Sequence, residues 1–245
     1  MPSDLRGREG VMGGRSMIRD RTAAALVAEA FGTFLFFFVG AGSVVLGDYL
    51  LANGGTSPGL VGVALAHGLA LAVLASALGA VSGAHFNPAV TLGVWIMGRI
   101  SATGAALYVV AQLVGGLAAG LALKVAFADS WQASKIGTPA LGAGITPVLG
   151  IGIEAVLTAL LLLVVIGTTV DARAPKLGGL AVGLAVTADI LVGGPLTGAA
   201  MNPARWFGPA VAAGAYADWY VWWIGPAIGA AVAALIYRTA LAEAS

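Results

Sequence analysis

The tripeptide Asn-Pro-Ala occurs twice in this chain, at residues 87–89 and 202–204, in nearly the same surroundings. Ser-Gly-Ala-His-Phe precedes the first copy, and Thr-Gly-Ala-Ala-Met precedes the second. Asparagine is among the best N-cap residues of a helix, and proline is favoured at the first helical position, where an N–H would have no helical partner. A single Asn-Pro would suggest an ordinary turn. Two copies in matched context instead predict two short helices, capped by Asn87 and Asn202, at equivalent places of two repeated halves.

The composition places these repeats in a membrane. Hydrophobic residues make up 59% of the chain and charged residues only 9%, whereas a soluble domain carries about 25% charged residues. Two apolar stretches, 88–97 and 203–213, would reach only about half of the hydrocarbon core at ~1.5 Å per residue. Six longer segments are long enough to cross it, at about 23–46, 59–81, 103–126, 145–170, 178–194 and 219–241. We therefore expect an all-α membrane protein with six transmembrane helices and two half-spanning re-entrant helices.

The spans divide into two halves of related sequence. Repeat one covers about 23–126 and repeat two about 145–241, within a channel domain of 23–241. Each half has three spans, and this odd number inverts the second half in the membrane. Inverted repeats with broken helices place a binding site near the bilayer midplane.

Basic residues predict the orientation. The Arg-rich residues 1–22 are expected to form a cytoplasmic tail. With that tail inside, Arg99, Arg173, Lys176 and Arg238 join it, and only Lys124 and Lys135 face outward. This distribution follows the positive-inside rule and predicts that both termini are cytoplasmic. We separately expect the membrane to be the plasma (inner) membrane.

The paired helix starts predict a selective pore. Each helix N-terminus carries roughly +0.5 elementary charge. Two starts that face each other at the bilayer centre would repel cations and protons, while the amides of Asn87 and Asn202 could bond a neutral polar solute. Glu29 and Glu154 occupy corresponding apolar spans and are expected to accept hydrogen bonds from loop N–H groups as structural anchors, with a proton relay as the alternative.

The sequence disfavours several other functions. It has no cysteine and only two histidines, and no cluster of residues suggests a metal or cofactor site or an enzyme's nucleophile–base pair. The basic residues form no clustered face for nucleic acid. An inverted-repeat secondary transporter of a small polar solute remains the alternative to a passive channel.

Several motifs resemble the aquaporin, or major intrinsic protein, family. The first is Ala-Glu-Ala-Phe-Gly-Thr-Phe at 28–34. The next two are the Asn-Pro-Ala motifs with their flanking residues, which include Pro88, Ala89, Pro203, Ala204 and Arg205. The last is Gly225-Pro226 in the last span. The resemblance covers about 23–241. It implies a homotetramer in the lipid bilayer. It also implies a channel that conducts water and small neutral solutes, such as ammonia, urea, glycerol or hydrogen peroxide, and excludes protons and ions.

The resemblance also implies a four-residue selectivity filter on the outer side of the paired asparagines. By position in the family's motifs, the four residues are His67, Ile190, Ala199 and Arg205. This set matches neither the family's strict water channels nor its glycerol channels, and it resembles the tonoplast-intrinsic subgroup of plants. His85 is a further candidate. It either lines the pore or fixes its loop by a hydrogen bond.

Two residues depart from the family's usual patterns. Asp189 stands where relatives in the tonoplast-intrinsic subgroup usually have asparagine. It is expected to bond the loop backbone, to pair with Lys135 at the pore mouth, or to alter the charge of the outer vestibule. Trp206 follows Arg205 at a position where the family's water channels commonly have a small residue, and its bulk is expected to shift the outer wall of the pore.

Overall fold

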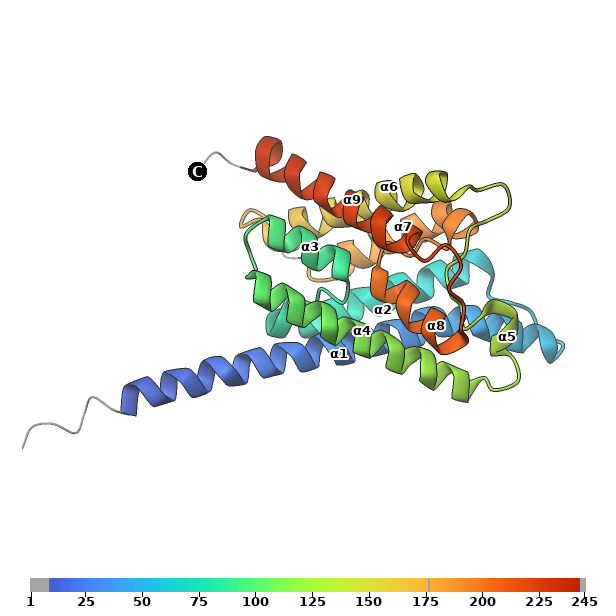
Figure 1. The fold of residues 1–245 in the computed structure, drawn as a ribbon, viewed down its shortest axis with the longest axis horizontal. Helices are drawn as coiled ribbons and strands as arrows, with labels where there is room; N and C mark the ends of the chain where they lie inside the picture. The colour runs from blue at the N-terminus through green and yellow to red at the C-terminus, as the bar shows by residue number, and fades with distance from the viewer. Residues whose placement is uncertain (1–8, 176, 243–245) are drawn as a thin grey trace, which may run out of the picture.

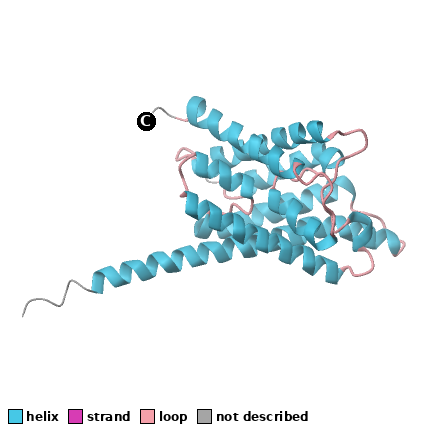
Figure 2. Cartoon of the chain, viewed as in Figure 1, coloured by secondary structure: helices cyan, strands magenta, loops and turns pink. Residues whose placement is uncertain are grey.

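The structure is a computed structural model that describes residues 9–175 and 177–242, with side chains from Thr22 onward. Within these ranges it contains helices and loops and no strand (Figure 2). The helices are α1 (Glu9–Ala52), α2 (Gly59–Ser82), α3 (Pro88–Ile96), α4 (Ala102–Ala126), α5 (Trp131–Ser134), α6 (Pro147–Val165), α7 (Leu180–Thr197), α8 (Pro203–Ala213) and α9 (Val221–Ile236). Two π-helical turns, η1 (Ile166–Val170) and η2 (Tyr237–Leu241), continue α6 and α9.

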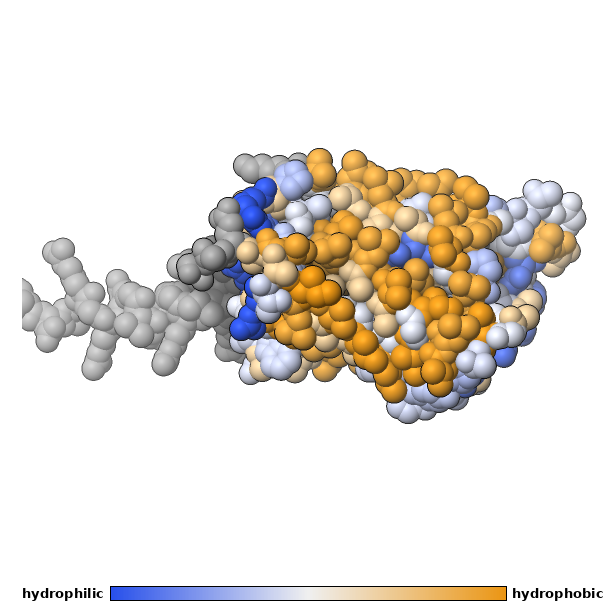
Figure 3. All heavy atoms as spheres, turned by 90° about the horizontal axis from the view of Figure 1, so that it is seen from above, coloured by the Kyte–Doolittle hydropathy of each residue, from blue (hydrophilic) through white to orange (hydrophobic). Residues whose placement is uncertain are grey.

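Six of these helices are long and apolar enough to cross a membrane, within the part of the chain that the structure describes. They lie side by side with their axes roughly along the long direction of the molecule (Figure 1). Hydrophobic residues cover the middle of the face shown in Figure 3, and hydrophilic residues gather mainly towards its two ends. The expected all-α membrane fold with six spans is confirmed.

The first span is longer than the sequence predicted. Residues 1–8 of the expected tail lie outside the described residues, but helix α1 already begins at Glu9. The segment 9–22 contains no proline. Its glycines, Gly10, Gly13 and Gly14, each weaken a helix by only about 1 kcal/mol, so the helix of the apolar span can continue toward the N-terminus.

The two short helices interlock the halves of the molecule. Helix α3 belongs to the first half of the sequence and packs mainly against α9 of the second half. Helix α8 belongs to the second half and packs mainly against α4 of the first. Helices α2 and α7 also meet across the two halves. The repeats expected at 23–126 and 145–241 thus share their packing and build one bundle (Figure 1).

Glycines let the helices approach closely, as the small-residue spacings of the sequence suggest. A Cβ added to Gly115 of α4 would overlap the carbonyl oxygen of Ala30 in α1, and one on Gly229 of α9 would overlap that of Ala155 in α6. On the other face of α4, a Cβ on Gly116 would lie 2.9 Å from the carbonyl oxygen of Ala204 in α8. The first two contacts bring spans together, and the third holds the re-entrant helix α8 against α4.

Gly115→Val is therefore expected to lower the free energy of unfolding by about 1–3 kcal/mol, the usual cost of overpacking. The measurement is denaturant unfolding in detergent micelles. Gly152→Val is the matched control, because no atom lies within 4 Å of a Cβ at that helical position. Equal stability of the two variants would contradict the close approach of α1 and α4.

Candidate pore

Each asparagine of the repeated motif caps its short helix. Asn87 Oδ1 accepts hydrogen bonds from the N–H groups of Ala89 at 2.8 Å and Val90 at 3.4 Å. Asn202 Oδ1 accepts from Ala204 at 2.9 Å and Arg205 at 3.2 Å. Proline follows both caps at the first helical position. The helix starts are thus fixed by their own side chains, as the sequence predicted.

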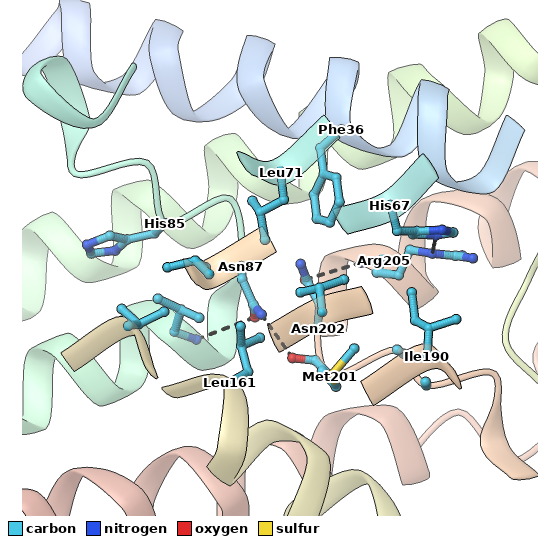
Figure 4. A pocket seen from close by; sticks show the side chains of 16 residues that line it. Phe36, His67, Leu71, His85, Asn87, Leu161, Ile190, Met201, Asn202 and Arg205 are labelled. Atoms are coloured by element: carbon cyan, nitrogen blue, oxygen red, sulfur yellow. Dashed lines mark hydrogen bonds between the residues drawn. The ribbon is translucent and has the colours of Figure 1, made fainter. Parts of the chain in front are cut away.

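The two capping side chains also bond across the repeat. Asn87 Nδ2 donates to the carbonyl oxygen of Met201 at 2.9 Å, and Asn202 Nδ2 donates to that of Phe86 at 2.9 Å. Each asparagine therefore holds the loop before the other asparagine. The two helix starts meet in the interior, where Asn87 and Asn202 are 4% and 3% exposed (Figure 4).

The loops before the two caps have the same unusual backbone. Ala84 and Phe86 have φ angles of 50° and 47°, and their counterparts Ala199 and Met201 have 44° and 53°. Positive φ costs energy for residues other than glycine, and it persists only where neighbouring contacts enforce it.

Two buried glutamates supply those contacts. Glu154 Oε1 accepts from Thr197 Oγ1 at 2.6 Å and Ala200 N at 3.0 Å, and its Oε2 accepts from Met201 N at 2.7 Å. No part of the Glu154 side chain is exposed. One carboxylate thus satisfies three donors of this buried loop.

Glu29 repeats this arrangement in the first half. Its Oε1 accepts from Ser82 Oγ at 2.7 Å and His85 N at 2.9 Å, and its Oε2 accepts from Phe86 N at 2.8 Å. The partners of Glu29 occupy the positions that correspond to the partners of Glu154. These bonds support an anchoring role for both glutamates.

Gln112 of α4 belongs to the same network, and the sequence analysis missed it. Its Nε2 donates to Glu29 Oε2 at 2.7 Å and to Thr91 Oγ1 at 3.0 Å. A fully buried glutamine in an apolar span is a detectable signal. Its partners come from two other helices, so the sequence did not indicate which groups it would join.

A narrow lumen runs past the two asparagines. The central cavity has a volume of about 30 Å³, which is room for roughly two water molecules. An outer vestibule of about 510 Å³ near α5 shares His67, Ile190 and Arg205 with this cavity. An inner vestibule of about 370 Å³, towards the end of the bundle where α9 finishes, shares His85 and Val165 with it. A central cavity of this volume has room for solutes only in single file.

The four residues expected to form the filter all line this central cavity. His67, Ile190, Ala199 and Arg205 come from α2, α7, the loop before α8 and α8, and each is 3–5% exposed. In Figure 4, His67, Ile190 and Arg205 lie on the same side of the two asparagines. The structure thus brings the four together at one constriction.

Hydrogen bonds orient the polar pair of this constriction. His67 Nδ1 lies 2.9 Å from the carbonyl oxygen of Val63 and must donate to it. His67 Nε2 is then the acceptor of a neutral ring, and Arg205 Nε donates to it at 3.2 Å. Arg205 Nη1 donates to the carbonyl oxygen of Gly137, in the loop after α5, at 2.8 Å. Both ring nitrogens of His67 are engaged, so the remaining N–H groups of Arg205 are the donors available to a permeating molecule.

His85 combines the two roles that the sequence left open. Its ring lines both the central cavity and the inner vestibule, on the opposite side of the asparagines from Arg205 (Figure 4). Its backbone N–H bonds Glu29, and its Nδ1 lies 3.0 Å from Thr91 Oγ1.

The structure corrects both expectations about the unusual residues. Asp189 is only 2% exposed, and its Oδ2 has no hydrogen-bond partner among the described residues. Asp189 therefore neither pairs with Lys135 nor bonds loop backbone. The reason is its position on α7, which turns its side chain into the bundle. Trp206 does not line the lumen. It stacks on Trp222 with ring centroids 5.7 Å apart, because the helical turn at the start of α8 points it away from the pore.

Six membrane spans around a single-file lumen, with two re-entrant helices that meet at its centre, define a membrane channel. The chain matches the model of the family described as "Major intrinsic protein" over residues 17–237. The maize protein "Aquaporin TIP4-4" is 51% identical over 219 residues, which cover 87% of this chain and 84% of that protein. The Arabidopsis thaliana "Probable aquaporin TIP3-2" is 45% identical and covers 87% of this chain and 82% of its own length.

A solved structure has the same fold. The X-ray structure of the aquaglyceroporin from Plasmodium falciparum superposes with a TM-score of 0.78 at 25% identity, covering 90% of this chain and 97% of that one. The chain belongs to the major intrinsic protein family. It is an integral multi-pass membrane protein and a passive channel for water and small solutes, and not an enzyme.

Proposed function

We propose that this channel conducts water together with ammonia, urea and other small neutral solutes, and that His67, Ile190, Ala199 and Arg205 select among them. The observation that carries the proposal is the Arg205–His67 hydrogen bond. It draws the guanidinium toward α2, while Ile190 and Ala199 line the same cavity with apolar surface. The constriction therefore combines one polar side with one apolar side.

Charge exclusion follows from the same geometry. The guanidinium of Arg205 repels cations before they reach the asparagines, and the two helix starts add positive potential at the centre. Each asparagine Nδ2 donates one hydrogen to a carbonyl oxygen and keeps one for a passing molecule. A water between the asparagines can accept there but finds no amide oxygen free of the helix caps, which breaks a proton-conducting chain.

Stopped-flow light scattering on proteoliposomes tests the proposal with water, glycerol and urea gradients, and an internal pH dye tests ammonia. We expect water and ammonia fluxes well above those of empty liposomes, with a low activation energy. Fluxes equal to those of empty liposomes would exclude conduction. Saturable flux that follows an ion gradient would instead favour a transporter.

His67→Phe is expected to reduce urea flux roughly tenfold while water flux changes much less, because a bulkier ring narrows the constriction and steric discrimination in such pockets is of this size. Val73→Phe is the matched control, since Val73 lies on the same helix and is 66% exposed. The measurement is the ratio of urea to water permeability. Equal losses of both would argue against His67 as a selectivity residue.

We propose that both termini are cytoplasmic and that the channel is a homotetramer. The positive-inside distribution supports cytoplasmic termini, and protease or tag accessibility in sealed vesicles tests it. The expected plasma-membrane location has no support, because the relatives are tonoplast-intrinsic aquaporins. Family resemblance supports a homotetramer, for which native mass spectrometry should give about four times the 24.2 kDa of one chain.

A further inference from the structure

A separate cavity lies beside the inner mouth of the pore. Its volume is about 200 Å³, and it is bounded by the turn after α3, by η1 with the loop that follows it, and by η2. Arg99, Asp171, Arg173 and Tyr237 line it together with apolar side chains. On the orientation proposed above, it sits at the cytoplasmic ends of α6 and α9, where the apolar spans give way to the hydrophilic end of the bundle (Figure 3).

Among the described residues that line the cavity, two arginines, Arg99 and Arg173, stand against one acidic residue, Asp171. Arg99 is exposed, and its guanidinium makes no hydrogen bond or ion pair with any residue that the structure describes. Arg238 of η2 does not line the cavity but lies beside it, because its Nη1 donates to the carbonyl oxygen of Ile96 at 3.2 Å and the next residue, Met97, is a lining residue. The third arginine, Arg173, forms a salt bridge of 2.5 Å with Asp171.

Asp171 is already occupied by its neighbours. Arg173 Nε donates to Asp171 Oδ1 at 3.0 Å, and the Tyr237 hydroxyl donates to Asp171 Oδ2 at 2.8 Å. The hydrogen bond and charge of Arg173 lower the pKa of the Asp171 carboxyl below its ordinary value. Asp171 therefore stays ionised at neutral pH and balances Arg173, and no other acidic residue that the structure describes lines the cavity to compensate the charge of Arg99.

We propose that this cavity binds the phosphate headgroup of an anionic phospholipid from the cytoplasmic leaflet. Guanidinium groups match phosphate oxygens in charge and geometry. Basic pockets at the cytoplasmic ends of membrane helices suit anionic headgroups. The apolar residues Met97 and Ile166 in the same cavity can receive the start of the lipid's chains. A soluble anion would use only the arginines and would gain nothing from this apolar lining.

The bound lipid would also contact the wall of the pore mouth. Val170 at the end of η1 lines both this cavity and the inner vestibule. Thr168 and Thr169 of the same turn line the vestibule. A headgroup in the cavity therefore braces η1 from behind and holds the mouth in its open shape.

Native mass spectrometry of the purified full chain with added lipid tests the binding. We expect phosphatidylglycerol to bind more tightly than phosphatidylcholine, and Arg99→Gln to weaken phosphatidylglycerol binding about fivefold, the usual contribution of one basic residue near an anionic membrane. Arg238→Gln should act likewise. Lys135→Gln is the charge-matched control, because Lys135 lines the outer vestibule at the opposite end. All these variants keep the Arg-rich segment 1–22, so any general attraction of that segment for anionic lipid is the same in each variant and does not affect the comparison.

Three results would overturn the proposal. They are equal binding of the two lipids, unchanged phosphatidylglycerol binding in both arginine variants, and displacement of the lipid by equimolar glycerol 3-phosphate, which would identify a site for a soluble anion. The effect on the pore mouth rests on the proposed function and is measured separately, as water permeability in phosphatidylcholine vesicles with and without phosphatidylglycerol. Higher permeability with phosphatidylglycerol, lost in Arg99→Gln, is expected. Lipid binding without that change would refute the bracing of η1 alone.

Discussion

Glu154→Leu is expected to lower the free energy of unfolding by about 3 kcal/mol or more, because each unpaired buried donor costs about 1–3 kcal/mol. The substitution leaves Thr197 Oγ1 and the N–H groups of Ala200 and Met201 without their acceptor. Removing a buried carboxylate returns part of its desolvation cost, which is why the expected loss is smaller than three full penalties. Denaturant unfolding in micelles gives the measurement.

The same residue offers a graded test. Glu154→Gln keeps one side-chain oxygen for Thr197 and Ala200 but turns an NH₂ group toward the N–H of Met201, so an intermediate loss is expected. Val156→Leu is the control, since Val156 lies on the same helix and is 70% exposed. If Glu154→Leu were as stable as the control, the carboxylate would not be what holds the loop before Asn202.

Arg205→Val is expected to raise the proton and cation leak at least ~100-fold, because a unit charge at about 4 Å contributes ~4 kcal/mol at the effective dielectric of a protein surface. Water flux should persist, since the asparagines and the helix starts are untouched. A pH dye inside proteoliposomes under a potassium diffusion potential measures the leak, and light scattering on the same vesicles measures water flux.

Lys135→Gln separates the role of Arg205 from a general loss of positive charge at the outer mouth. Lys135 lines the outer vestibule but not the central cavity. We expect little leak from this variant. A leak equal to that of Arg205→Val would place the barrier to cations in the vestibule. If neither variant leaked, the two helix starts alone would be enough to exclude cations.

The features that repeat in the sequence were the ones that could be predicted from it. The caps at Asn87 and Asn202, the six spans and the acceptor roles of Glu29 and Glu154 all follow from local rules about helix starts, span length and buried charge. Each rule needs only a residue and its immediate neighbours, and each had two copies to compare.

The features that sequence reasoning missed depend on distant partners. The acceptor of Arg205 Nη1 is a backbone carbonyl in the loop after α5, and a carbonyl carries no residue signal. The side of α8 to which Trp206 turns depends on Trp222 in α9. Asp189 was expected at the mouth because it adjoins Ile190, but neighbouring residues of a helix point in different directions.

The crossed asparagine bonds bear on how transport itself can occur. Alternating access requires one repeat to rock against the other around a central site. Here Asn87 and Asn202 each hold a carbonyl of the opposite half, and α3 and α8 are each packed into the half that does not encode them. A rocking motion would have to break both bonds and withdraw each short helix from the half against which it packs. The contact between the two repeats at the centre of the molecule is therefore rigid. Solutes move through the lumen while the two repeats keep the same position relative to each other.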